Sequence, residues 1–118
     1  HFAHASMQLP IAFALDGKMQ ENILPHVDLL KVGSLEFREI TTERYPIWCI
    51  KDELLKNPSR GVVVNAANEA AIEKFISGKI GFMDIAKTVI KAYEKFDTLP
   101  KSVDDVFAID KAVRAFIV

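Results

Sequence analysis

Residues 61–76 read GVVVNAANEAAIEKFI. Its first half is apolar almost all round, with three valines followed by paired alanines and no proline. Gly78, two residues beyond it, is typical of a helix C-terminal cap. A helix that is apolar on every face must be buried, and small alanines let neighbouring helices approach closely. We therefore expect residues 61–76 to form the central helix of a bundle.

Three polar residues interrupt this apolar stretch. Asn65, Asn68 and Glu69 fall at positions i, i+3 and i+4, so they share one face of the helix. Buried polar groups find hydrogen-bond partners. On the structural interpretation this polar stripe holds a neighbouring loop or helix end in register, and the alternative is contact with a ligand. If the stripe is structural, Asn68→Leu should cost a few kcal/mol by orphaning its partners.

Helical patterns flank the central stretch on both sides. Pro46 suits a first turn, and apolar residues then recur at helical spacing until Asn57-Pro58 ends the element. Residues 82–93 follow the three-four spacing of another amphipathic helix, with lysines on the opposite side. With a last helical stretch after Pro100, residues 44–118 are predicted to form a compact bundle of about four helices.

The last stretch carries its own start signal. Ser102 has Asp105 three residues on, a capping-box-like arrangement that contributes about 1 kcal/mol. We expect the helix to kink and to restart at Asp110. Asp110 and Arg114 lie one turn apart and are expected to pair on a solvated face.

The front of the chain contains a short, nearly all-apolar helix pattern. Pro10 precedes five apolar residues and then Asp16-Gly17, with proline in the first turn and glycine after the end. Such a helix must be buried, and no strand long enough to cover it follows nearby. We therefore expect its covering layer upstream of His1, which makes the chain a fragment.

Residues 18–43 show weak periodicity. Only residues 32–38 alternate with a period of two, with Leu35 and Phe37 on one face. A lone strand leaves its backbone groups unpaired, so we expect it to extend the edge of a sheet made by other parts of the protein. The predicted fold class is mainly α: a bundle of about four helices, preceded by a connector with one or two short strands.

Composition narrows the function classes. Fifteen basic and sixteen acidic residues give a net charge of -1, so nucleic acid is a poor candidate partner. No apolar run approaches the roughly 20 residues that cross a bilayer, so no membrane association is expected. The single cysteine, Cys49, lies between Trp48 and Ile50; we interpret it as core packing in a cytoplasmic protein rather than as a reactive thiol.

No metal-binding or nucleophile pattern is present: the sequence has no histidine pair at ligand spacing, no second cysteine and no glycine-rich phosphate loop. The segment from His4 to Pro10 forms a polar turn before the apolar helix. It is either a site facing a ligand or a simple loop. His1 and His4 are expected to be exposed loop residues.

Read in order, these segments resemble the family of 1-deoxy-D-xylulose 5-phosphate reductoisomerases, over essentially the whole chain. Residues 64–69, VNAANE, are similar to the family's Leu-Asn-Ala-Ala-Asn-Glu motif. Six further stretches add support: Met7 with Pro10-Ile11-Ala12, residues 29–37 (LLKVGSLEF), Arg44-Tyr45-Pro46, residues 81–85 (GFMDI), residues 103–106 (VDDV), and Asp110 with Arg114.

The resemblance implies a multidomain enzyme, α/β plus α. Residues 1–16 would end its catalytic domain, 17–43 would be the connecting segment, and 44–118 the C-terminal helical bundle. The family converts 1-deoxy-D-xylulose 5-phosphate, a small sugar phosphate, into 2-C-methyl-D-erythritol 4-phosphate in the non-mevalonate isoprenoid pathway. It uses NADPH and a divalent ion, magnesium or manganese, and its members are homodimers.

Carried over to this sequence, the resemblance assigns Met7 alone to the cofactor, as a thioether against the nicotinamide region. No catalytic or metal-binding residue is expected here, so the fragment would mainly support the rest of its own chain and be inactive alone. The family's usual Pro-Asp-Met-Arg is Ala5-Ser6-Met7-Gln8 here, so polar contacts at those positions are not transferred. The competing hypothesis is a stand-alone helical scaffold module without catalysis.

Overall fold

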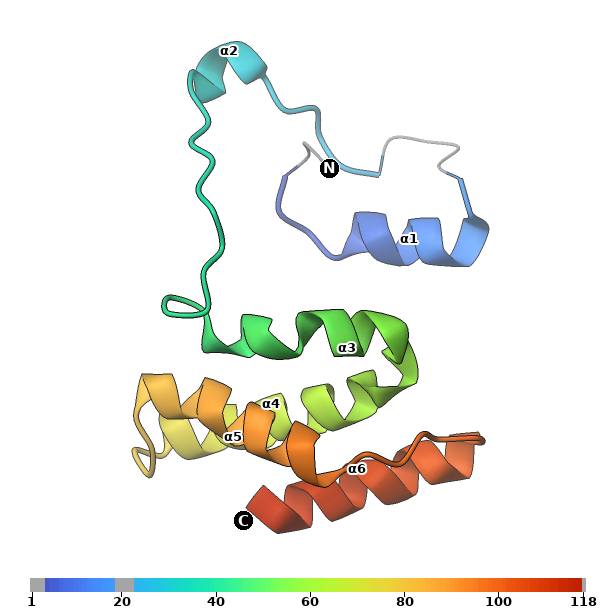
Figure 1. Ribbon diagram of the computed structural model, residues 1–118. Coiled ribbons are helices and arrows are strands. Elements are labelled where there is room, and N and C mark those ends of the chain that lie inside the picture. The colour runs from blue at the N-terminus through green and yellow to red at the C-terminus, as the bar shows by residue number, and fades with distance from the viewer. Residues whose placement is uncertain (1–3, 19–22, 118) are drawn as a thin grey trace. The chain divides into compact units, whose positions relative to one another are not determined.

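The computed structural model describes residues 4–18 and 23–117, which fall into two compact units, His1–Arg38 and Glu39–Val118. Figure 1 shows the order of the elements. They are α1 (Gln8–Asp16), α2 (Leu29–Val32), the 3-10 helix η1 (Pro46–Ile50), α3 (Lys51–Lys56), the 3-10 helix η2 (Pro58–Arg60), α4 (Gly61–Ile76), α5 (Phe82–Lys95) and α6 (Val103–Ile117). The predicted, mainly helical fold is confirmed.

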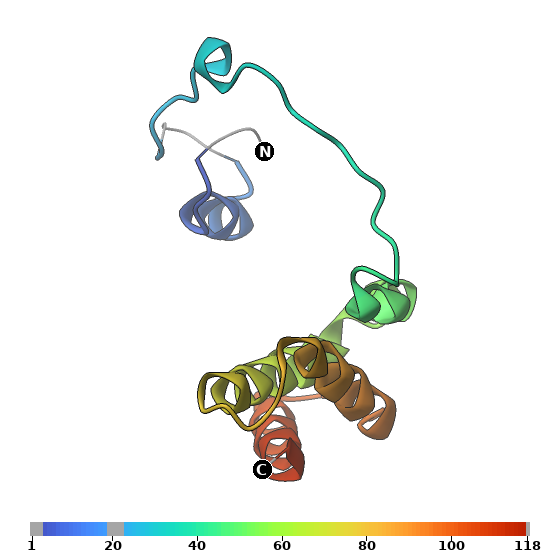
Figure 2. The same cartoon turned by 90° about the vertical axis from the view of Figure 1, so that its left-hand side faces the viewer.

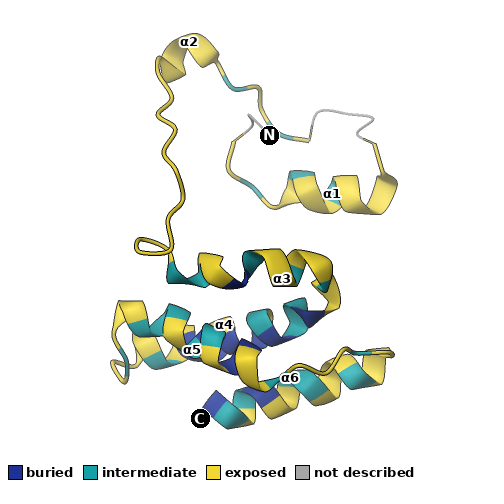
Figure 3. Cartoon of the chain, in the orientation of Figure 1, coloured by how far each residue is buried: buried dark blue, intermediate teal, exposed yellow. Residues whose placement is uncertain are grey.

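The first unit contains the predicted apolar helix, α1. Gly17 ends it in the left-handed conformation, with φ of 69°, and donates its N–H to the carbonyl of Phe13 at 2.8 Å. That geometry favours glycine because a Cβ would be strained there. No residue of α1 is buried within the described part of the unit, and Leu15 is 81% exposed (Figure 3). Its apolar side chains therefore lack a cover in these residues.

The predicted strand at residues 32–38 is not shown. Val32 instead ends the one-turn helix α2, which begins where the Asp28 carboxylate accepts the N–H of Leu30 at 3.1 Å. Residues 33–40 have no regular structure, and no strand occurs among the residues that the structure describes. A strand requires a neighbour to pair its backbone groups, and none of the described segments supplies one.

The second unit is built around α4, as the sequence predicts. Helices α5 and α6 both pack against it, and two views show them on its surface (Figures 1 and 2). Fully buried alanines on α4, Ala66, Ala67 and Ala71, let the helices approach closely. The core cluster consists of Val63, Ala66, Ala67, Ala70, Val89, Ala92, Val113 and Ile117.

A buried cation closes one end of the bundle. Arg60 is 6% exposed and donates from one nitrogen to the Glu53 carboxylate and from another to the backbone carbonyls of Tyr93 and Phe96. The last carbonyls of a helix have no partner within the helix. Arg60 supplies that partner for α5, and its guanidinium lies 3.7 Å from the centroid of the Tyr93 ring.

Helix α6 confirms one prediction and corrects another. The hydroxyl of Ser102 accepts the N–H of Asp105 at 3.2 Å, and the Asp105 carboxylate accepts the N–H of Ser102 at 3.0 Å, so the capping box is present. The predicted kink at Asp110 is wrong, because α6 runs unbroken from Val103 to Ile117. No proline or glycine lies between Val103 and Ile117, so nothing interrupts the helix at Asp110, and the buried residues Val113 and Ile117 follow it in the same helix.

The prediction that Cys49 is buried is also wrong. We expected it in the core, but its side chain is exposed, and Ile50 is buried in its place. Residues 46–50 form a 3-10 helix rather than an α-helix. The tighter turn changes which side chains face inward.

Candidate functional site

Met7 lies immediately before α1. Its backbone carbonyl accepts the N–H of Ile11 at 3.1 Å, and the Ser6 hydroxyl accepts the N–H of Gln8 at 3.2 Å, so the turn is held by local bonds. The Met7 side chain is 70% exposed within its unit. His4, in the same turn, is exposed, and His1 lies outside the described residues. An exposed, flexible thioether suits contact with a flat ring but supplies no charge.

The polar stripe of α4 divides into two parts. Asn65 donates to the Glu69 carboxylate at 3.3 Å, and Glu69 accepts from Arg114 of α6 at 2.6 Å. Arg114 also donates to Asp110 at 2.9 Å, which is the predicted pair within α6. Two stripe residues thus join a cluster that ties α4 to α6, an interhelical contact that the sequence pattern does not specify.

Electrostatics within this cluster follow from its geometry. The hydrogen bond from the Arg114 guanidinium holds the pKa of Glu69 below its usual value. Hydrogen bonds to Asp110 and then Glu69 raise the pKa of Arg114. Because these side chains are between a third and a half exposed, salt screens their attraction. The cluster fixes the register of two helices.

Asn68 behaves differently from its two neighbours. It is exposed, whereas the sequence analysis placed it among buried groups. Its side chain has no hydrogen bond to another residue that the structure describes. Asn68 instead lines a groove on the surface of the second unit, together with Val64 from the preceding turn of α4.

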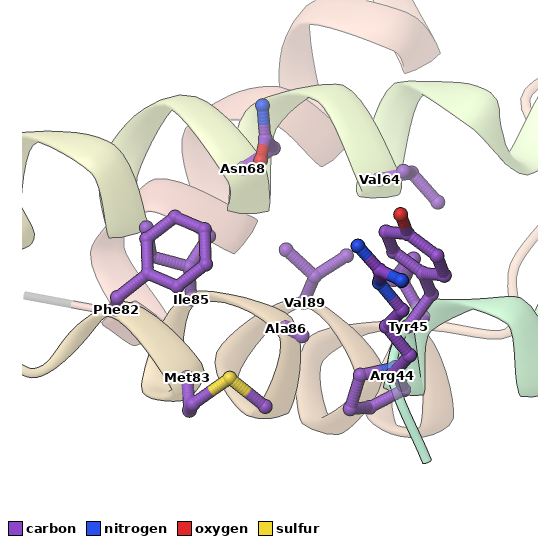
Figure 4. A pocket seen from close by; sticks show the side chains of 11 residues that line it. Arg44, Tyr45, Val64, Asn68, Phe82, Met83, Ile85, Ala86 and Val89 are labelled. Carbon is purple, nitrogen blue, oxygen red and sulfur yellow. The ribbon is translucent and has the colours of Figure 1, made fainter. Parts of the chain in front are cut away.

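The groove has a volume of about 220 Å³ and lies between the segment that enters η1, one side of α4 and the start of α5 (Figure 4). We call it the α4–α5 groove. Its lining residues are Arg44, Tyr45, Pro46, Ile47, Val64, Asn68, Phe82, Met83, Ile85, Ala86 and Val89. Three stretches that are far apart in the sequence, 44–47, 64–68 and 82–89, therefore form one surface.

Apolar side chains make up most of this lining, with polar groups at its edge. The Arg44 guanidinium lies 5.6 Å from the centroid of the Tyr45 ring and forms no ion pair with a described residue. No nucleophile, histidine or carboxylate lines the groove. The arrangement suits binding of an apolar group.

Sequence reasoning singled out Asn68 but missed the groove. Phe82 and Met83, which are 70% and 48% exposed, open α5 after Gly81. The Asp84 carboxylate accepts the Gly81 N–H at 3.1 Å and fixes the start of this helix. Two large exposed apolar residues at a helix start were the available signal, but their partners come from distant parts of the sequence.

Among the described parts of the chain, no three His, Cys, Asp or Glu residues are grouped to hold a metal ion. None of the described helices has the length and apolar character to cross a membrane.

Comparisons with known proteins agree on one family. A family model described as the DXP reductoisomerase C-terminal domain matches residues 2–116. A 1-deoxy-D-xylulose 5-phosphate reductoisomerase from Nautilia profundicola is 50% identical over 97% of this chain and 31% of its own length. The corresponding protein from Wolinella succinogenes is 41% identical, over 98% of this chain and 32% of its own length.

A solved structure shows the same fold. It is the 1-deoxy-D-xylulose 5-phosphate reductoisomerase from Zymomonas mobilis in complex with NADPH, 35% identical with a TM-score of 0.74. The match covers 99% of this chain and 32% of that one. The chain thus spans about a third of the length of the relatives it matches.

Proposed function

Because the chain belongs to the DXP reductoisomerase family and matches its C-terminal domain, we propose that it is the C-terminal part of an enzyme that makes 2-C-methyl-D-erythritol 4-phosphate. The substrate is 1-deoxy-D-xylulose 5-phosphate, and NADPH supplies the hydride. The observation that carries the proposal is the match over residues 2–116 with a fold shared at a TM-score of 0.74.

Within that enzyme, we assign residues 44–118 a supporting role. Their titratable cluster, Glu69 with Arg114 and Asp110, is engaged in joining two helices. The groove offers apolar contacts and no reacting group. A bundle of this kind braces the catalytic part of the protein rather than carrying out chemistry. The polar stripe belongs to this brace, with Glu69 holding α6 and Asn68 facing outward.

Met7 is the residue that we assign to the cofactor. Its exposed thioether, at the start of an apolar helix, is available to lie against the nicotinamide ring of NADPH. The turn contains no carboxylate, so the divalent ion that the family uses would be held by other parts of the enzyme. The described residues do not fit a metal site.

The test is an assay of the complete protein that contains these residues. With deoxyxylulose phosphate, manganese and NADPH, we expect the absorbance of NADPH to fall and a methylerythritol phosphate product to appear. Turnover should require all three components. A folded complete protein that oxidises no NADPH would overturn the assignment and favour the stand-alone scaffold.

A further inference from the structure

We propose that the α4–α5 groove holds an extended segment of the same polypeptide from the part preceding these residues, with an apolar side chain in the groove and a carboxylate at Arg44. The inference rests on the proposed function, since it names the surface by which the bundle braces the catalytic part. It concerns the second unit only.

Apolar exposure supports an occupant. Phe82, Met83 and Tyr45 are each close to half exposed or more, and they gather around one depression instead of being scattered over the surface. Grouped apolar side chains of this kind mark interaction sites, whereas single exposed ones are ordinary. Figure 4 shows Phe82 and Met83 on one side of the groove and Tyr45 on the other.

Polar groups at the edge define the chemistry of the occupant. The Arg44 guanidinium has no ion pair with a described residue, and the Asn68 amide has no hydrogen-bond partner among them. A carboxylate is the group that a guanidinium binds best, through two parallel hydrogen bonds. The primary amide of Asn68 can donate to a backbone carbonyl and accept from a backbone N–H. A peptide segment with an Asp or Glu beside an apolar residue satisfies all three features.

The size of the groove favours a single inserted segment over a small molecule or a second copy. A volume of about 220 Å³ is below the roughly 300–1,000 Å³ of pockets that enclose a whole small-molecule ligand. Stable dimers bury about 800 Å² on each partner, far more than a depression of this size presents. One or two side chains from an extended chain fit it.

The lengths of the relatives indicate which part of the polypeptide the occupant of the groove comes from. This chain covers 31% and 32% of two of them, and the family model that it matches is the C-terminal domain. In those proteins about two thirds of the polypeptide therefore precedes the matched region. An intramolecular segment needs little affinity, because its effective concentration near the groove is high.

Cysteine labelling in the complete protein tests the occupancy. Met83→Cys places a thiol in the groove, and Lys91→Cys places one on the exposed surface of the same helix, outside the groove. Both variants react with a maleimide in native and in urea-denatured protein, and mass spectrometry of the peptides gives a protection factor for each site. We expect protection of about 100-fold or more at position 83 and less than about 10-fold at position 91.

The charge is tested in the Met83→Cys background. Arg44→Glu should raise the native labelling rate about tenfold or more by repelling the carboxylate, whereas Lys101→Glu should not. Circular dichroism checks that each variant keeps its helices. Labelling at position 83 that is as fast as at position 91 overturns the inference, as does protection that Arg44→Glu leaves unchanged. Protection that disappears on dilution to the monomer assigns the groove to a second copy and also overturns it.

Turnover separates this inference from the proposed function. NADPH oxidation by the Lys91→Cys protein, together with fast labelling at position 83, leaves the enzyme assignment intact and removes the occupant. Slow labelling at position 83 in a protein that does not oxidise NADPH supports the occupant and removes the enzyme assignment.

Discussion

Replacing Arg60 by methionine should loosen the end of α5 more than any exposed substitution in the bundle. Methionine keeps the unbranched stem of the side chain as far as the position of Nε but removes the donors to the carbonyls of Tyr93 and Phe96. A buried carbonyl left without its partner costs about 1–3 kcal/mol. Loss of the stacking on Tyr93 adds about 1 kcal/mol. Glu53 is more than half exposed and regains water, so it adds little.

The expected loss is therefore about 3 kcal/mol, which corresponds to a factor of about 100 in a local opening equilibrium. Native-state hydrogen exchange of the complete protein, read by mass spectrometry, measures it in peptides that cover α5. We expect the amides near Ala92 and Tyr93, both buried, to exchange about 100-fold faster in Arg60→Met.

The matched control makes the same chemical change at an exposed ion pair. Arg38 pairs with Glu36 at 2.8 Å, and both side chains are exposed. Arg38→Met should leave the exchange of α5 unchanged, because exposed pairs contribute little. If Arg60→Met changes the exchange near Tyr93 by less than threefold, the carbonyl-capping role of Arg60 is refuted.

Ser102→Ala should cost about 1 kcal/mol and speed hydrogen exchange of the first α6 amides about fivefold, whereas Ser102→Thr should keep the cap. Equal exchange rates in the two variants would contradict the role of the capping box. The hydrogen bond from Arg114 lowers the pKa of Glu69, and the backbone N–H of Lys101 lowers the pKa of Asp105. Each carboxylate therefore stabilises the folded state above its unfolded-state pKa, and this stabilisation is lost as pH falls through the folded-state pKa. The midpoint of urea unfolding should therefore fall as the pH drops below about 4.5, and it should fall less steeply in Asp105→Asn than in the unmodified protein. Parallel plots of midpoint against pH for the two proteins would refute this. On the function proposed above, Met7→Ala in the complete protein should raise KM for NADPH with little change in Tm, and unchanged kinetics would contradict the assignment of Met7 to the cofactor.

Elements whose signals are local were predictable from the sequence. Helix α4 is bounded by its apolar run and by Gly78, and α6 by the Ser102–Asp105 box, so neither depends on distant residues. The strand predicted at residues 32–38 is not shown among the described residues, because pairing depends on a neighbour, which alternation alone does not supply. The burial of Cys49 was predicted wrongly because residue spacing does not distinguish a 3-10 turn from an α-helical one.

The candidate site was less predictable than the fold for the same reason. Met7 rests on a resemblance and on its exposure, and the bond between Glu69 and Arg114 joins residues 45 apart in sequence. The groove requires residues 44–47, 64–68 and 82–89 to meet, which no pattern within a single stretch encodes. Once the helices are placed, a surface assembled from distant segments becomes visible.

The motif at residues 64–69 shows why the groove matters. Ala66 and Ala67 face the core, where packing against α5 and α6 fully accounts for small side chains. Glu69 is accounted for by its bond to Arg114. Asn68 is accounted for by neither, because leucine at an exposed position of α4 would leave the described contacts intact. If Asn68→Leu keeps the bundle's exchange rates but speeds labelling at position 83, then Asn68 acts on something outside these residues. Should it instead destabilise α4 directly, the stripe is purely structural and Asn68 has no outward role.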